Sequence, residues 1–113
     1  MMNPAKFPLL AGVALTALAL SAPVRADTQL EITLTDTAFE PAEVKVPAGA
    51  AFTVLVHNKS AAVAEIEAKD LKIEKVVAAG EDILINVRAQ DAGTYLFVNE
   101  YKEDTIFGHI TAE

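Results

Sequence analysis

Carboxylate side chains are concentrated in two stretches in the second half of the sequence. One runs from residue 65 to residue 75 and the other from residue 99 to residue 105. Carboxylate oxygens are hard ligands, which suit iron, Mn²⁺ and Ca²⁺ by type, and Cu²⁺ and Zn²⁺ by general affinity. Crowded carboxylates repel one another, and a bound cation relieves that repulsion. The alternative is that both stretches form a solvated acidic surface, the more common role of acidic loops.

Composition excludes several other chemistries. The sequence contains no cysteine, and its two methionines are Met1 and Met2. A chain that loses these two residues has no sulfur ligand for Cu(I) or an iron–sulfur cluster. The net charge of −7 disfavours binding to nucleic acid or to an anionic membrane surface. The sequence has no Gly-rich phosphate loop and no nucleophile with a base at motif spacing, so a hydrolase function has no support.

The first 26 residues have the features of a secretory signal peptide. Lys6 supplies the positive charge, residues 7–20 form an apolar run, and Val24-Arg25-Ala26 places small residues at the −3 and −1 positions. We expect cleavage between Ala26 and Asp27, which removes both methionines, and a periplasmic location. The apolar run is short for a membrane span, so the mature protein is not expected to be membrane-embedded. An uncleaved N-terminal anchor is the alternative.

Residues 27–113 alternate apolar and polar side chains, as strands with one buried face do. In residues 30–35, for example, Leu30, Ile32 and Leu34 alternate with polar residues. The same pattern predicts further strands within residues 43–46, 52–57, 83–87, 94–97 and 108–112. Residues 61–79 are less regular and fit a single helical turn or an edge strand. We predict one all-β domain, residues 27–113, forming a sandwich or barrel of about seven strands.

Four segments of the chain carry a family resemblance. They are Phe39-Glu40-Pro41-Ala42-Glu43-Val44-Lys45-Val46-Pro47-Ala48-Gly49, Phe52 to Asn58, Gly93-Thr94-Tyr95-Leu96-Phe97, and Gly108-His109-Ile110-Thr111. In order and spacing these segments resemble the strands of the cupredoxins. The resemblance implies a cupredoxin-like Greek-key β-sandwich with two ligand loops at one end.

Electron-transfer cupredoxins bind copper through two His, one Cys and usually an axial Met. The resemblance places Asn99 at the Cys position, Lys102 near the following His position, and Glu65 at or next to the first His position. Residues 105–107 cover the Met position and contain no methionine. The resemblance therefore implies that no type-1 copper site is present.

Two runs resemble a particular group of cupredoxin-like domains, those associated with bacterial iron uptake. The runs are Glu65-Ile66-Glu67-Ala68-Lys69-Asp70-Leu71-Lys72-Ile73-Glu74-Lys75 and Asn99-Glu100-Tyr101-Lys102-Glu103-Asp104-Thr105. Relatives often carry an aromatic residue at the Ile66 position and a His at the Lys102 position. The resemblance implies that both loops meet at one pole of the sandwich and gather carboxylates there. The implied metal ligands are Glu65, Glu67, Glu100, Glu103, Asp104 and, as a nitrogen donor, His109. Asp70 and Glu74 fit the same run, but they are also placed to pair with Lys72 or Lys75.

The resemblance implies a periplasmic accessory protein of ferrous-iron uptake that binds iron or copper through oxygen ligands. Its implied partners are an inner-membrane iron permease and a periplasmic iron-binding protein. Participation in iron oxidation needs an electron acceptor, and the sequence shows no redox centre. The alternative is a metal-free interaction module that docks through its acidic end. Tyr101 and Phe107 flank the implied site and either shield it or pack ordinarily, and His57 is expected at the surface.

Overall fold

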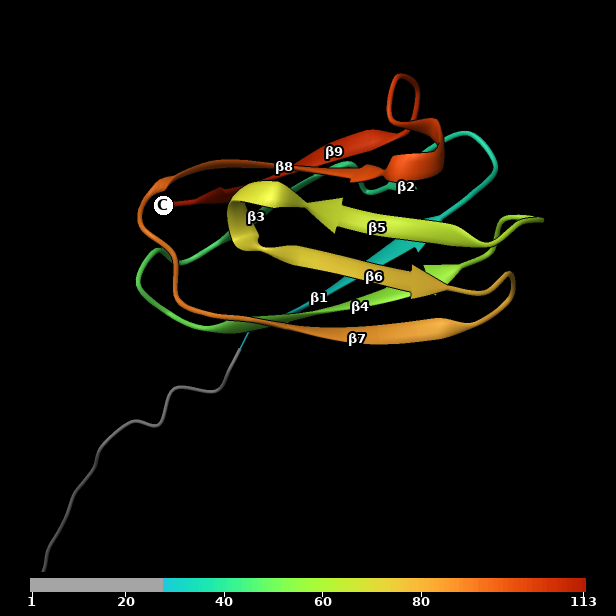
Figure 1. The fold of residues 1–113 in the computed structure, drawn as a ribbon. Helices are drawn as coiled ribbons and strands as arrows, with labels where there is room; N and C mark the ends of the chain where they lie inside the picture. Colours follow the sequence, from blue (N-terminus) through green and yellow to red (C-terminus); the bar gives the residue numbers. More distant parts are fainter. Residues whose placement is uncertain (1–27) are drawn as a thin grey trace, which may run out of the picture.

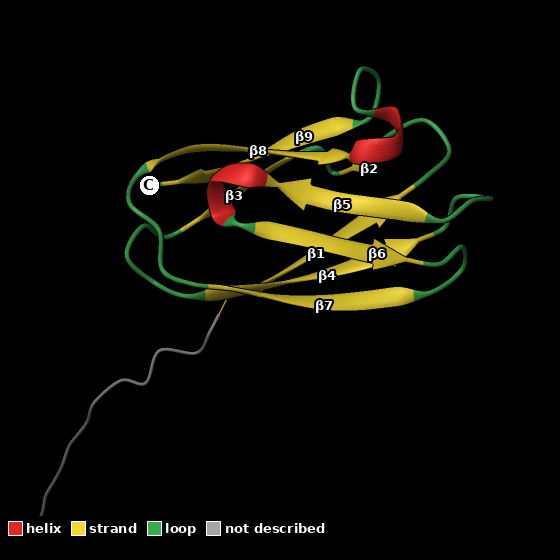
Figure 2. Cartoon of the chain, viewed as in Figure 1, coloured by secondary structure: helices red, strands yellow, loops and turns green. Residues whose placement is uncertain are grey.

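The computed structural model describes residues 28–113, so the predicted signal peptide, residues 1–26, and its cleavage site lie outside the described residues. The described chain forms nine strands in two sheets that pack face to face (Figures 1 and 2). The strands are β1 (Thr28–Leu34), β2 (Phe39–Glu40), β3 (Glu43–Val46), β4 (Phe52–Asn58), β5 (Ala64–Ala68), β6 (Ile73–Val77), β7 (Asp82–Val87), β8 (Gly93–Asn99) and β9 (Phe107–Ala112). Two short 3₁₀ turns, η1 (Lys69–Leu71) and η2 (Glu100–Lys102), follow β5 and β8.

The strands are divided between a four-stranded sheet, in the order β2-β1-β4-β7, and a five-stranded sheet, in the order β3-β9-β8-β5-β6. The pairs β1–β4 and β3–β9 are parallel and the other pairs are antiparallel. The predicted all-β sandwich is confirmed. The described chain has nine strands rather than about seven, because residues 61–79 form the β5–β6 hairpin around η1 and because β2 is a separate two-residue strand. Between residues 28 and 113, no helix is long and apolar enough to cross a membrane.

The predicted alternation fills the space between the sheets with apolar side chains. In β4, Phe52, Val54 and Val56 are buried, while the residues between them are half-buried on the outer face. The rings of Phe39 and Phe97 come from opposite sheets and meet edge to face, with their centroids 4.8 Å apart. The core therefore fixes which residues of each strand point outward.

Gly108 allows β9 to approach the segment that leads into β3. The amide of His109 donates a hydrogen bond of 2.7 Å to the carbonyl oxygen of Ala42. A Cβ atom at residue 108 would overlap that carbonyl oxygen and would lie 2.5 Å from Cζ of Phe97. Neither a backbone carbonyl nor a buried ring can move away easily, so only glycine fits here.

Replacing Gly108 by alanine is expected to lower the free energy of unfolding by about 3 kcal/mol, the upper part of the usual range for overpacking. Urea denaturation measures this change. Gly93→Ala is the matched control, because a Cβ at Gly93 would meet only the Tyr95 ring at 3.7 Å or more, an ordinary contact. Equal stability of the two variants would contradict the close approach.

His57 links three strands on the outer face of the four-stranded sheet. Its Nε2 lies 2.9 Å from Glu31 Oε1 on β1, and its Nδ1 lies 2.8 Å from Asp82 Oδ1 on β7. Both ring nitrogens must donate to satisfy two carboxylates, which requires the charged imidazolium. The hydrogen bonds to Glu31 and then to Asp82 raise the pKa of His57 above its ordinary value of 6.5, against a smaller opposing effect of desolvation.

This arrangement predicts a pH-dependent contribution to stability. Because the pKa of His57 is raised in the folded state, its contribution is fully present below about pH 6.5 and is lost as the pH rises through the folded-state pKa. Wild type and His57→Gln are compared by urea denaturation between about pH 5 and about pH 9. We expect the wild type to be more stable at low pH and the difference to shrink at high pH. A difference that does not change with pH would contradict the ion-paired imidazolium.

Candidate metal centre

Two buried asparagines shape the end of the sandwich where β4 ends and β5 begins. Asn58 Oδ1 accepts hydrogen bonds from the amide and the hydroxyl of Ser60, and its Nδ2 donates to the carbonyl oxygens of Ala62 and Val77. Asn99 is 5% exposed, and its Oδ1 accepts from the amides of Glu65 at 3.2 Å and Tyr101 at 3.3 Å. Asn58 thus holds the loop before β5, and Asn99 joins the start of β5 to η2.

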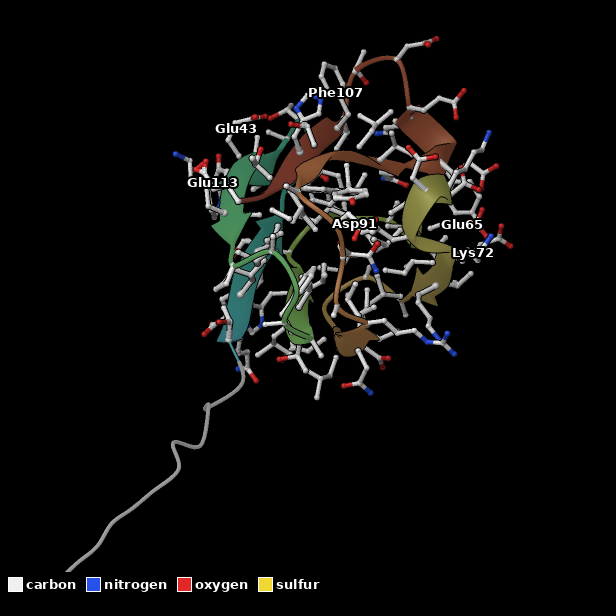
Figure 3. All side chains as sticks on the ribbon, turned by 90° about the vertical axis from the view of Figure 1, so that its left-hand side faces the viewer. Glu43, Glu65, Lys72, Asp91, Phe107 and Glu113 are labelled. Atoms are coloured by element: carbon white, nitrogen blue, oxygen red, sulfur yellow. The ribbon has the colours of Figure 1, made fainter. Side chains whose placement is uncertain are left out.

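The strand register shows which way the acidic residues point. Ile66 of β5 pairs with Asn99 of β8, and both side chains are buried between the sheets. Glu65 and Glu67 alternate with Ile66, so they project from the outer face of the five-stranded sheet. Figure 3 shows Glu65 on the side of the β5 ribbon that faces away from the opposite sheet. The acidic site therefore lies on the outer face of the sheet beside the predicted pole, rather than in the interior beside Asn99.

Three glutamates form a cluster on this outer face. They are Glu65 of β5, Glu74 of β6 and Glu100 of η2, and one carboxylate oxygen of each lies within 4.8 Å of the others. Glu74 pairs with Glu67 across the β5–β6 hairpin, which makes it a diagonal neighbour of Glu65. The sequence alone allows two roles for Glu74, a metal ligand or a partner in an ion pair with a lysine. Identifying a tight turn at residues 69–72, where Lys72 has a positive φ of 57°, would have predicted the hairpin and this neighbour.

Three other predicted ligands lie next to the cluster. Glu67 is 7% exposed, and its Oε1 lies 4.0 Å from the Lys69 ammonium group. Glu103 and Asp104 line, together with Glu67, a surface hollow of about 370 Å³. The three-residue cluster therefore includes Glu65 and Glu100 from the predicted set and leaves Glu103 and Asp104 at its edge.

His109 lies apart from the cluster. Its Nδ1 hydrogen-bonds with Glu43 Oε2 at 2.9 Å, across the β3–β9 pair. Strand β8 separates β9 from β5, so His109 supplies no nitrogen to the three-glutamate group. Tyr101 and Phe107, which were expected to flank the site, are both largely exposed. Neither side chain is therefore packed into the interior beside the cluster.

The neighbouring carboxyl groups shift the pKa of Glu100 above its ordinary value of 4.5. A hydrogen bond with Glu65 is the largest effect that raises the pKa of Glu100, and desolvation and the negative charge of Glu65 act in the same direction. The hydrogen bond with Glu67 opposes this shift, and the charge of Glu103 adds to it. Three carboxylates are therefore gathered at one place, where a proton or a cation relieves their mutual repulsion.

The interior of the same end does not fit a type-1 copper ion. The Oδ1 of the buried Asn99 accepts hydrogen bonds from two backbone amides, and the chain has no cysteine to supply a thiolate. Ala64, rather than Glu65, faces inward on the same side of the sheet as Asn99. Ile106 and the backbone around Lys102 complete this end through hydrogen bonds of ordinary length. The protein therefore has no type-1 copper site.

The two packed sheets form a sandwich of the cupredoxin type. The chain belongs to the Cupredoxin-like domain family, whose family model matches residues 8–112. A similar curated protein is the uncharacterized protein RP394 of Rickettsia prowazekii (strain Madrid E), which is 32% identical over 82 residues. That alignment covers 73% of this chain and 66% of the relative, so the chain spans just under two thirds of the relative's length.

Solved cupredoxin structures have the same fold. Auracyanin from Roseiflexus castenholzii is 22% identical with a TM-score of 0.63, and the match covers 79% of this chain and 99% of auracyanin. The metal binding domain of the Cu(I) exporting P-type ATPase CopA from Streptococcus pneumoniae D39 is 19% identical with a TM-score of 0.67. That match covers 81% of this chain and 92% of the domain. At these identities the similarity shows the shared fold alone.

Replacing Glu100 by glutamine is expected to stabilise the metal-free protein at pH 7. Because the pKa of Glu100 is raised in the folded state, its contribution to stability is present below its ordinary value of 4.5 and is lost as the pH rises through the folded-state pKa. The advantage of the variant should therefore shrink as the pH falls. Urea denaturation in a chelator between about pH 4 and about pH 8 tests this. Glu81→Gln removes one charge outside the cluster, and an equal effect of both variants would contradict the assignment.

Proposed function

We propose that this protein is a periplasmic metal-binding protein that holds a hard cation between Glu65, Glu74 and Glu100. The observation that carries the proposal is the approach of one carboxylate oxygen from each residue to within 4.8 Å of the others. Hard cations bind oxygen at about 2.0–2.6 Å, so modest side-chain rotations bring all three oxygens to a common ion. Water molecules complete the coordination, since Glu74 is exposed and the other two residues are only half-buried.

Iron is the cation that we propose first. The site offers three anionic oxygens and no sulfur or nitrogen ligand, so it favours hard ions and binds Fe³⁺ more tightly than Fe²⁺. Cu²⁺ is the second candidate because of its high affinity for most ligand sets. The fold is compatible with metal handling, since the similar Streptococcus pneumoniae domain is described as a metal binding domain with Cu(I).

The proposed biological role is that of an accessory protein of ferrous-iron uptake. The resemblance of residues 65–75 and 99–105 to iron-uptake cupredoxin-like domains supports this role, and so does the predicted export signal at residues 1–26. The proposed partners are an inner-membrane iron permease and a periplasmic iron-binding protein. The mature unit in this role is the domain of residues 27–113. No part of the proposal requires the protein to oxidise iron.

Metal binding is tested by calorimetry on the mature protein with Fe²⁺ under anaerobic conditions, and with Mn²⁺, Zn²⁺ and Cu²⁺. Glu65→Gln, Glu74→Gln and Glu100→Gln are each expected to weaken binding by at least about tenfold, the lower end of the effect of losing even an outer-shell partner. Binding should also raise the free energy of unfolding, by about 2.7 kcal/mol at a cation concentration of roughly 100 times Kd.

Glu81→Gln is the matched control, because it removes the same charge from a site outside the cluster. Its affinity for each cation should equal that of the wild type. If the wild type and all four variants bind equally weakly, the carboxylates act as a diffuse surface charge and the proposed centre is wrong.

A further inference from the structure

An apolar strip crosses the outer face of the five-stranded sheet. Leu96 and Val98 of β8 alternate with buried residues of the same strand, and Phe107 of β9 lies directly opposite Val98. Leu96 is 48% exposed and Phe107 is 47% exposed, although both are large apolar side chains. Figure 3 shows Phe107 on the outer side of β9, the side on which Glu43 also lies. Val98 is only 8% exposed, so the exposed apolar surface of the strip comes mainly from Leu96 and Phe107.

The β8 part of the apolar strip forms the floor of the hollow of about 370 Å³. Leu96 and Val98 are its apolar lining, and η1 and the loop after η2 form its sides. An apolar side chain of another molecule can enter such a hollow and remove this surface from water. The hollow is therefore shaped to receive one or two apolar side chains rather than a flat surface.

The rim of the hollow is strongly acidic. Its charged residues are Glu67, Asp70, Glu103, Asp104 and Lys69, four carboxylates and one ammonium group. Lys69 is already within 4.0 Å of Glu67 Oε1, so its charge is partly offset. On the far side of the strip, His109 is held by Glu43. A partner whose apolar residues enter the hollow thus meets net negative charge around them.

The geometry points to a docking site for a basic amphipathic segment of another protein. Aliphatic or aromatic side chains of this segment pack on Leu96, Val98 and Phe107, while its Lys or Arg residues pair with Glu103, Asp104 and Asp70. Charge complementarity selects this occupant. A second copy of this chain would bring like charges together, because each copy carries a net negative charge, and an anionic membrane would be repelled. None of the three cluster glutamates lines the hollow, so the docking site and the metal centre use different residues.

The docking site is tested with the mature protein and three short fluorescein-labelled peptides, followed by fluorescence anisotropy in chelator. One peptide has Leu and Phe flanked by Lys and Arg, the second replaces Leu and Phe by Ser, and the third replaces Lys and Arg by Glu. Only the first is expected to bind, and its affinity should fall as salt is raised, because exposed charges are screened. Binding of the second peptide as tight as that of the first would overturn the proposal, because it would show charge attraction alone.

Two variants locate the peptide on the protein. Leu96→Ser and the double variant Glu103→Lys with Asp104→Lys are each expected to weaken binding of the first peptide by about tenfold or more. Leu84→Ser is the matched control, because Leu84 is 52% exposed on the outer face of the other sheet. Unchanged affinity in Leu96→Ser, or an equal loss in Leu84→Ser, would overturn the assignment.

Two further measurements separate this site from the alternatives. Glu65→Gln should bind the peptide as tightly as the wild type does. The peptide-binding result therefore stands even if the proposed metal centre proves wrong. Loss of peptide binding in Glu65→Gln would overturn the separation of the two sites. Sedimentation velocity of the protein alone should show no self-association, and association that Leu96→Ser abolishes would assign the face to a second copy instead.

Discussion

The pairing of β5 with β8 is the constraint on which the chemistry of this protein depends. In this register Ile66 lies opposite Asn99 inside the sandwich, and Glu67 lies opposite Val98 outside it. The Asn99 side chain holds the register, because its oxygen accepts the amides of Glu65 and Tyr101 on two different elements. A slip of one residue would turn Glu65 and Glu67 into an apolar core, where unpaired carboxylates are very unfavourable. The acidic site and the packed core are therefore fixed by the same contact.

The position of Asn99 explains why this sandwich handles charge differently from a blue-copper protein. The oxygen of its side-chain amide accepts from two backbone N–H groups and so supplies a structural link, and the chain has no cysteine to supply a thiolate. The acidic groups that remain are on the outer face, where water and ions reach them. There a hydrogen bond with Glu65, desolvation and the negative charge of Glu65 raise the pKa of Glu100.

The outer faces of the two sheets differ in their charge arrangement. On the four-stranded sheet, His57 lies between Glu31 and Asp82, so that one imidazolium satisfies two carboxylates. On the five-stranded sheet, three glutamates meet without a cationic side chain between them, and an apolar strip runs alongside. The first arrangement is complete within the chain, whereas the second lacks a positive charge that a cation or a basic partner can supply. This difference is the reason why both proposed sites lie on the five-stranded sheet.

The sequence by itself determined the class of fold and one important absence. Alternation of apolar residues, as in Phe52, Val54 and Val56, predicted the strands and their buried faces, and the lack of cysteine ruled out type-1 copper. Alternation is a local feature and cysteine content is a matter of composition, so both can be recognised in the sequence without knowledge of the three-dimensional structure. Only the tertiary structure decided that Glu65 points outward, that Glu74 joins it, and that His109 pairs with Glu43 instead. Those outcomes depend on hairpin register and strand order, which are set by contacts between residues far apart in the chain.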